Sequence, residues 1–182
     1  MTPPLAPPDF LQPLADFYAH TGAPLPRIEP IGGETMPEPY RTLLVHRNDM
    51  TPTLERHHGS QIHLRVLRSE RHGPFYHREV ALLLDGSLKP VEFGAIRVTL
   101  DLYPADAQEM ILKEYVPLGS ILDRFEIVHT CHPSAYLRIV ADSLISAELH
   151  VAESAVLYGR RNTLKDAQGR VLSEIVEILP SA

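Results

Sequence analysis

One stretch of the chain carries two arginines inside an apolar strand pattern: Leu157-Tyr158-Gly159-Arg160-Arg161-Asn162-Thr163-Leu164. It is followed by Asp166-Ala167-Gln168-Gly169, where glycine makes the positive φ of a tight turn inexpensive, and then by a second apolar run. The pattern predicts a hairpin of two strands, 156–164 and 171–179. The hairpin brings both arginines beside Glu174, and a carboxyl next to two cations indicates chemistry rather than packing.

The middle of the chain extends the predicted sheet away from this hairpin. Residues 61–68 alternate polar and apolar, which is the period of a half-buried strand. Residues 75–84 and 91–100 flank a second turn signal, Asp85-Gly86-Ser87-Leu88. These three segments predict an antiparallel meander.

The segment between residues 134 and 150 is harder to assign. Residues 135–140 alternate like a strand, whereas 142–150 fit either a helix or a strand, and pairing with the neighbouring elements favours a strand. The Pro-rich stretch 24–39 predicts a loop. Helices are predicted at 10–18, at 50–58 between an Asn48-Asp49 cap and Gly59, after Pro104 to about Tyr115, and as a short turn at 120–125.

These elements predict one α+β domain, an antiparallel sheet of about six strands with helices on one face. A length of 182 residues with 44% hydrophobic and 22% charged residues is that of an ordinary globular chain with a sizeable core. We expect the domain to span residues 9–182, preceded by a flexible Pro-rich leader at 1–8.

Charge and cysteine usage restrict the partners and the compartment. A formal net charge of −6 argues against a nucleic-acid partner, so an anionic ligand would have to be held by local arginines. The single cysteine, Cys131, excludes an internal disulfide and agrees with a reducing compartment. No apolar run reaches the roughly 20 residues of a membrane span. We expect a cytoplasmic protein; the sequence does not indicate its oligomeric state.

Arg78 stands out because it shares a strand face with Tyr76, Val80 and Leu82. A partly desolvated guanidinium requires an anionic partner. Two alternatives stay open: an internal carboxylate such as Glu92 or Glu174, or the carboxylate of a ligand, which the planar fork of arginine fits.

Glu174 is the candidate acid. It alternates with Val176 and Ile178, so we expect it on an apolar strand face, where burial raises the pKa of a carboxyl and a nearby arginine lowers it. The alternative is an ordinary salt bridge to one of the arginines.

Four segments together resemble the chorismate lyase family over residues 48–180. They are Asp49-Met50-Thr51 with Leu54-Glu55, Arg78-Glu79-Val80, Pro117-Leu118-Gly119 and Tyr158-Gly159-Arg160-Arg161. The resemblance implies the fold of that family and cleavage of chorismate to 4-hydroxybenzoate and pyruvate, a reaction of ubiquinone biosynthesis. It implies no metal and no coenzyme.

The resemblance also implies residue roles. Arg78 would clamp a substrate carboxylate and, with Glu174 as general acid, form the catalytic pair. Glu177 is the alternate acid, because its distance from Leu179-Pro180 is nearer to the family spacing, although it would need a bulge to reach the face of Glu174. The ligand-binding residues would be Met50, Leu118 through its backbone N–H, Arg160 and Arg161.

Other functions are compatible with the same residues. The fold implied by the resemblance is also similar to the effector-binding domain of certain bacterial transcription regulators, so a non-catalytic sensor or carrier of an aromatic or cyclohexadiene carboxylate is the main alternative. A plain interaction module would instead pair Arg78 internally. The histidines, among them His57-His58, His63, His72 and His77, show no ligand spacing that predicts a metal site.

Overall fold

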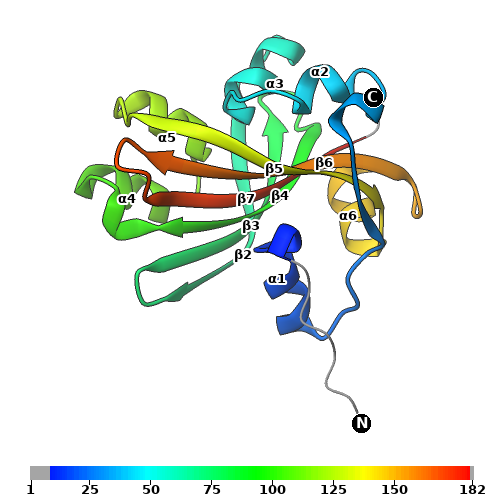
Figure 1. The fold of residues 1–182 in the computed structure, drawn as a ribbon, viewed down its shortest axis with the longest axis horizontal. Helices are drawn as coiled ribbons and strands as arrows, with labels where there is room; N and C mark the ends of the chain where they lie inside the picture. Colours follow the sequence, from blue (N-terminus) through cyan, green and yellow to red (C-terminus); the bar gives the residue numbers. More distant parts are fainter. Residues whose placement is uncertain (1–8, 181–182) are drawn as a thin grey trace.

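The computed structural model describes residues 9–180, and the expected leader at 1–8 lies outside them. Seven strands form one antiparallel sheet in the order β1-β5-β6-β7-β4-β3-β2 (Figure 1). The strands are β1 (Ile28–Ile31), β2 (Ile62–His72), β3 (Phe75–Leu84), β4 (Pro90–Thr99), β5 (His129–Val140), β6 (Val156–Asp166) and β7 (Val171–Leu179). The α+β class and the antiparallel sheet are confirmed, with β6 and β7 as the predicted hairpin.

The seventh strand lies in the Pro-rich stretch that was predicted to be a loop. β1 pairs with β5, with Ile28 opposite Ile139 and Pro30 opposite Leu137. Proline is tolerated there because β1 is an edge strand, whose outer side needs no ladder hydrogen bonds.

Six α-helices lie before or between these strands within the described residues. They are α1 (Leu14–Thr21), α2 (Tyr40–Leu44), α3 (Met50–His58), α4 (Ala105–Leu112), α5 (Leu118–Arg124) and α6 (Ser143–Leu149), with short 3-10 turns at Asp9–Leu11, Gly33–Thr35 and Leu100–Leu102. The preference for a strand at 142–150 was wrong. Asp142 caps α6 by accepting a hydrogen bond from the Ile145 backbone N–H at 2.9 Å.

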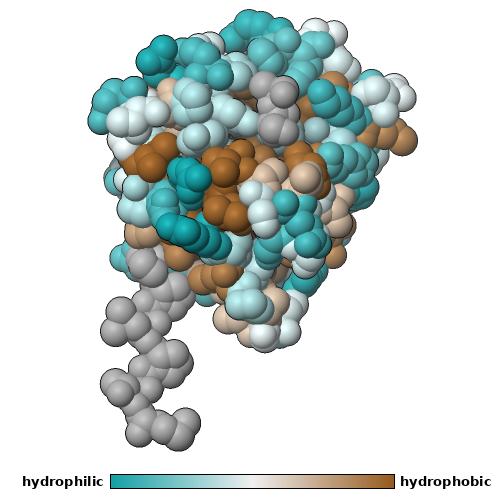
Figure 2. All heavy atoms as spheres, turned by 90° about the vertical axis from the view of Figure 1, so that its right-hand side faces the viewer, coloured by the Kyte–Doolittle hydropathy of each residue, from teal (hydrophilic) through white to brown (hydrophobic). Residues whose placement is uncertain are grey.

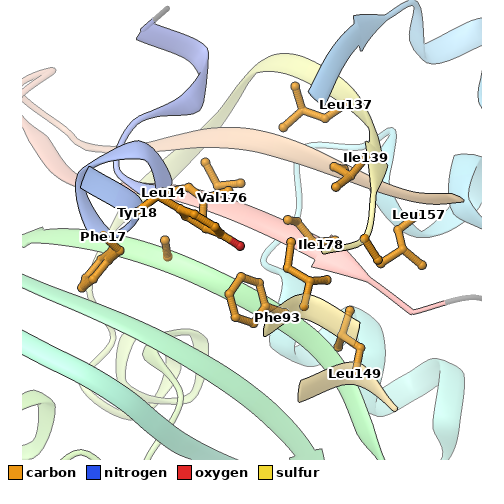
Figure 3. Packing of buried hydrophobic residues seen from close by; sticks show 13 residues of the cluster. Leu14, Phe17, Tyr18, Phe93, Leu137, Ile139, Leu149, Leu157, Val176 and Ile178 are labelled. Carbon is orange, nitrogen blue, oxygen red and sulfur yellow. The ribbon is translucent and has the colours of Figure 1, made fainter. Parts of the chain in front are cut away.

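The expectation of helices on one face of the sheet is also corrected. Helices α1 and α6 pack on one face, over Phe93, Ala95 and Val176, as Figure 3 shows for Phe93 and Val176. The helices α2 to α5 cover the other face, over residues such as Val80 and Ile96. Both faces are covered because the central strands are apolar on both sides: β3 and β4 are buried along almost their whole length.

The side of the molecule that carries α6 has apolar side chains at its surface (Figure 2). Figure 2 shows hydrophobic side chains in the middle of this side, with hydrophilic side chains around them. The partly buried apolar residues that edge the α1/α6 core include Leu25, Ile28, Leu144, Val151 and Ala155. Among residues 9–180, no helix is long and apolar enough to cross a membrane.

Candidate functional site

A cavity of about 60 Å³ lies between the sheet and the helices α3 and α5. One water molecule needs roughly 10–15 Å³ measured in this way, so the cavity has room for several waters, and a ring compound would have to widen it. Its walls are mostly apolar, and Gly94 leaves the floor free of a side chain. The polar residues that line it are Asp49, Thr51, Arg78, Glu92 and Asn162.

Arg78 reaches the cavity from β3 and is only 2% exposed. Within residues 9–180 it makes no ion pair, and neither Glu92 nor Glu174 contacts it. Its guanidinium donates a long hydrogen bond of 3.4 Å to the Ile111 carbonyl and also interacts with the Tyr76 hydroxyl, whereas its Nε has no partner in the described chain. Burial lowers the pKa of Arg78, opposed by Tyr76 and Glu114. The structure therefore lacks the internal ion pair that the sequence left open.

Glu92 lies at the other end of the cavity. It is opposite Leu82 on β3, whereas Arg78 is opposite Ile96 on β4. The two side chains are thus four residues apart on one face, roughly 13 Å along the strands. Burial raises the pKa of the Glu92 carboxyl well above its usual range, and Glu177 raises it further against the effect of Arg160. Glu92 therefore holds its proton to higher pH than an ordinary glutamate, and its Oε2 has no partner among the described residues.

Arg160 and Glu177 form a buried ion pair near Glu92, outside the lining of the cavity. Arg160 is fully buried and donates to the Glu177 carboxylate. It also donates to the backbone carbonyls of Leu44, His46 and Asn48, at 3.3, 3.1 and 3.0 Å. The pair fixes the segment that leads into α3, and the Glu177 charge adds to the effect of burial in raising the pKa of Glu92.

The structure places Glu174 and Arg161 away from this cavity. Glu174 contacts Arg97 and Arg161 on the α1 face of the sheet, beside an open groove that Asp9 also lines. The expected parity was correct, because Glu174 alternates with Val176 and Ile178, but these residues belong to the α1/α6 core. The assignment of Glu174 to the face of Arg78 is therefore corrected.

Glu177 lies on the cavity side without any bulge. It is opposite Gly94 on β4 and opposite Arg160 on β6 in regular register. The expectation that it would need a bulge assumed that the site lay on the other face of β7. Glu177 serves as the partner of Arg160 rather than as a lining residue.

Met50 and Leu118 both line the cavity, Met50 at the start of α3 and Leu118 at the start of α5. The sequence reasoning missed Glu92 and Asn162 as site residues. A signal for Glu92 was present, because it stands between Val91 and Phe93 in an apolar strand. Asn162 carries a buried Oδ1 with no partner in the described chain, and it directly follows the two arginines.

No protein-family model matches the chain, and no curated protein matches it. Several solved structures, however, are similar to the chain. The gene product SA0254 from Staphylococcus aureus matches with a TM-score of 0.56 and 9% identity, over 73% of this chain and 88% of that one. The effector domain of PhnF from Mycobacterium smegmatis matches with 0.53 and 12%, over 84% and 92%.

The ligand-binding domain of a GntR-family transcriptional regulator from Bordetella bronchiseptica matches with a TM-score of 0.50 and 12% identity, over 65% of this chain and 85% of that one. At such identities the matches show the fold alone. The chain has the chorismate lyase-like fold, which these ligand-binding and effector domains of regulators share.

Proposed function

We propose that this protein binds a small ring carboxylate in the cavity between the sheet and α3/α5, as a sensor or carrier. The observation that carries the proposal is Arg78, a buried guanidinium that lines the cavity and has no carboxylate partner within residues 9–180. A buried charge with no carboxylate in contact costs several kcal/mol, which Tyr76 and the more distant Glu114 offset only in part, so a bound anion would lower that cost.

The two ends of the cavity favour a ligand with two different polar ends. Arg78 presents a cation for a carboxylate at one end, and at the other Glu92, whose pKa is raised, can donate to a hydroxyl or carbonyl oxygen when it is protonated. The apolar residues between them, among them Val80, Leu118 and Leu122, suit the faces of a ring. A 4-hydroxybenzoate-like molecule has this arrangement.

The sensor or carrier function is favoured over catalysis by two observations. The expected acid, Glu174, lies on the other face of the sheet. The solved structures of the same fold include domains described as the ligand-binding or effector domains of transcription regulators.

Cleavage of chorismate stays a second candidate because of Glu92. A carboxyl that lines the cavity and keeps its proton is able to protonate the departing enolpyruvyl group, and the ring gains aromaticity as that group leaves. In this alternative Glu92, not Glu174, would be the general acid, and Arg78 would hold a substrate carboxylate.

Calorimetry with 4-hydroxybenzoate tests the binding proposal. We expect Arg78→Met to weaken binding by about 2–5 kcal/mol, the loss that follows removal of one partner of a buried charge pair. Arg161→Met is the matched control, because Arg161 lies on the other face, and its affinity should equal that of the original protein.

A second readout separates lost binding from lost folding. Removal of the unpaired charge should leave the free energy of unfolding of Arg78→Met unchanged or raised, as measured with urea. Equal affinity in the two variants, or no binding by the original protein, would contradict the proposal.

Incubation with chorismate then separates the two candidate functions. A sensor or carrier yields no pyruvate above the uncatalysed rate. Pyruvate and 4-hydroxybenzoate that appear with the original protein and with Glu174→Gln, but not with Glu92→Gln, would instead establish a lyase that uses Glu92.

A further inference from the structure

Asp49, His129 and Cys131 bring three different metal-ligating atoms together at the edge of α3. The His129 Nε2 lies 2.9 and 3.0 Å from the two carboxylate oxygens of Asp49, and the Cys131 Sγ lies 3.3 Å from Oδ1. All three ligand atoms lie within 4.8 Å of one another. This cluster is separate from the Arg78 end of the cavity, although Asp49 also lines the cavity wall.

The ring of His129 is already oriented by its other nitrogen. Nδ1 lies 2.8 Å from the carbonyl oxygen of Ile127, which can only accept a hydrogen bond, so Nδ1 carries a proton. In a neutral imidazole, Nε2 would then direct a lone pair at the Asp49 carboxylate, which is repulsive. With a second proton on Nε2 the contact is an ion pair between His129 and Asp49, and a metal ion would replace that proton between the same atoms. A backbone carbonyl on the far nitrogen is the usual arrangement for a metal-bound histidine.

The backbone sets up the other two ligands. His129 and Cys131 are two residues apart on β5 and therefore point to the same face. Asp49 occupies the N-cap position of α3, but its side chain makes no capping hydrogen bond and points to His129 and Cys131 instead. The Asp49 carboxylate therefore does not accept the hydrogen bond from a backbone N–H of the first helical turn that an N-cap aspartate usually accepts.

We propose that Asp49, His129 and Cys131 bind a zinc-type divalent cation. In a tetrahedral site with metal–ligand distances of roughly 2.0–2.3 Å, neighbouring ligand atoms lie about 3.3–3.8 Å apart, so small side-chain adjustments suffice. A carboxylate, a thiolate and a neutral imidazole balance the charge of the ion. The thiol proton and the proton on His129 Nε2 pass to solvent on binding.

The fourth coordination position faces an outer groove rather than the protein interior. This groove is lined by all three ligands and by Thr53, Arg56, Thr130 and His132. A water or a small anion fills the fourth position, as in zinc sites with three protein ligands. Imidazole together with thiolate favours zinc, cobalt or copper over magnesium or calcium.

Cobalt tests the site directly, because its spectrum reports on the ligands. After treatment with a chelator and under reducing conditions, Co²⁺ titration of the full chain should give one equivalent of tetrahedral cobalt with a near-ultraviolet thiolate band. Zinc should displace it. In Cys131→Ser the thiolate band should disappear, and in Asp49→Asn and His129→Gln the zinc affinity in calorimetry should fall by at least about tenfold.

His132→Gln is the matched control, because His132 is a neighbouring histidine that is not one of the ligands. His20, Glu70 and His72 form a second, exposed cluster of potential metal ligands in the described part of the chain. His72→Gln tests whether cobalt binds there instead. Both variants should keep the cobalt spectrum. Absence of the thiolate band in the original protein would overturn the proposal, as would its loss in His132→Gln or His72→Gln. Circular dichroism of each variant confirms that it is folded.

Discussion

Glu92 makes the pH dependence of stability a test of a single residue. The folded state retains the Glu92 proton above the ordinary value of 4.5, whereas the unfolded chain releases it. Stability therefore falls as the pH rises from that value towards the raised pKa, by up to about 1.4 kcal/mol per pH unit for one proton. Glu92→Gln lacks this proton, so its free energy of unfolding in urea should fall less between about pH 5 and about pH 8. Equal slopes would mean that Glu92 is ionised.

Two other residues, Arg78 and Glu174, show how far the sequence could predict the site. Arg78 was identified because a charge inside an apolar strand is conspicuous, and the lack of a carboxylate in contact with it among residues 9–180 agrees with the ligand alternative. Glu174 was placed wrongly because alternation tells which residues share a face, but not which face forms the site. β7 is apolar on both sides, with Val176 in the α1/α6 core and Leu179 in the core beneath α2 and α3, so the pattern could not decide.

The pairing of β6 and β7 explains the glycine in the Gly-Arg-Arg segment. A Cβ at Gly159 would overlap the backbone carbonyl oxygen of Glu177, so the two strands approach too closely for a side chain there. Gly159→Ala should separate the strands, disturb the Arg160–Glu177 pair and lower the free energy of unfolding by about 1–3 kcal/mol or more. Gly94→Ala is the comparison, because its Cβ would lie 3.1 Å from the Val176 carbonyl oxygen and needs a smaller shift. Urea unfolding should rank Gly159→Ala as the less stable variant.

Strong local signals explain which elements the sequence predicted. α3 was recognisable from Asp49 and Gly59 at its ends, and β2 to β4 from alternation and the Asp85-Gly86 turn. β1 and α6 were missed for different reasons. β1 exists only because β5 offers an edge to pair with, which no local pattern reveals. For α6, the Asp142 cap was present but was outweighed by expected strand pairing.

At the scale of the molecule, the resemblance to chorismate lyase correctly predicted the fold. It does not decide the function, because solved structures of the same fold include domains described as the ligand-binding or effector domains of transcription regulators. The metal-ligand cluster was beyond the sequence as well: Asp49 is 80 residues from His129, and only the contact between α3 and β5 brings them together.

The sheet divides the molecule into a face that supports the fold and a face that also holds the cavity, which predicts that stability and binding can be separated. Leu14 in α1 and Leu122 in α5 are both fully buried, but only Leu122 lines the cavity. Leu14→Ala and Leu122→Ala should each lower the free energy of unfolding by about 2–5 kcal/mol, since each leaves a hole in a packed core. Calorimetry below the unfolding transition should find the affinity for 4-hydroxybenzoate unchanged in Leu14→Ala and reduced in Leu122→Ala. A loss of affinity in Leu14→Ala equal to that in Leu122→Ala would show that the two faces are not independent.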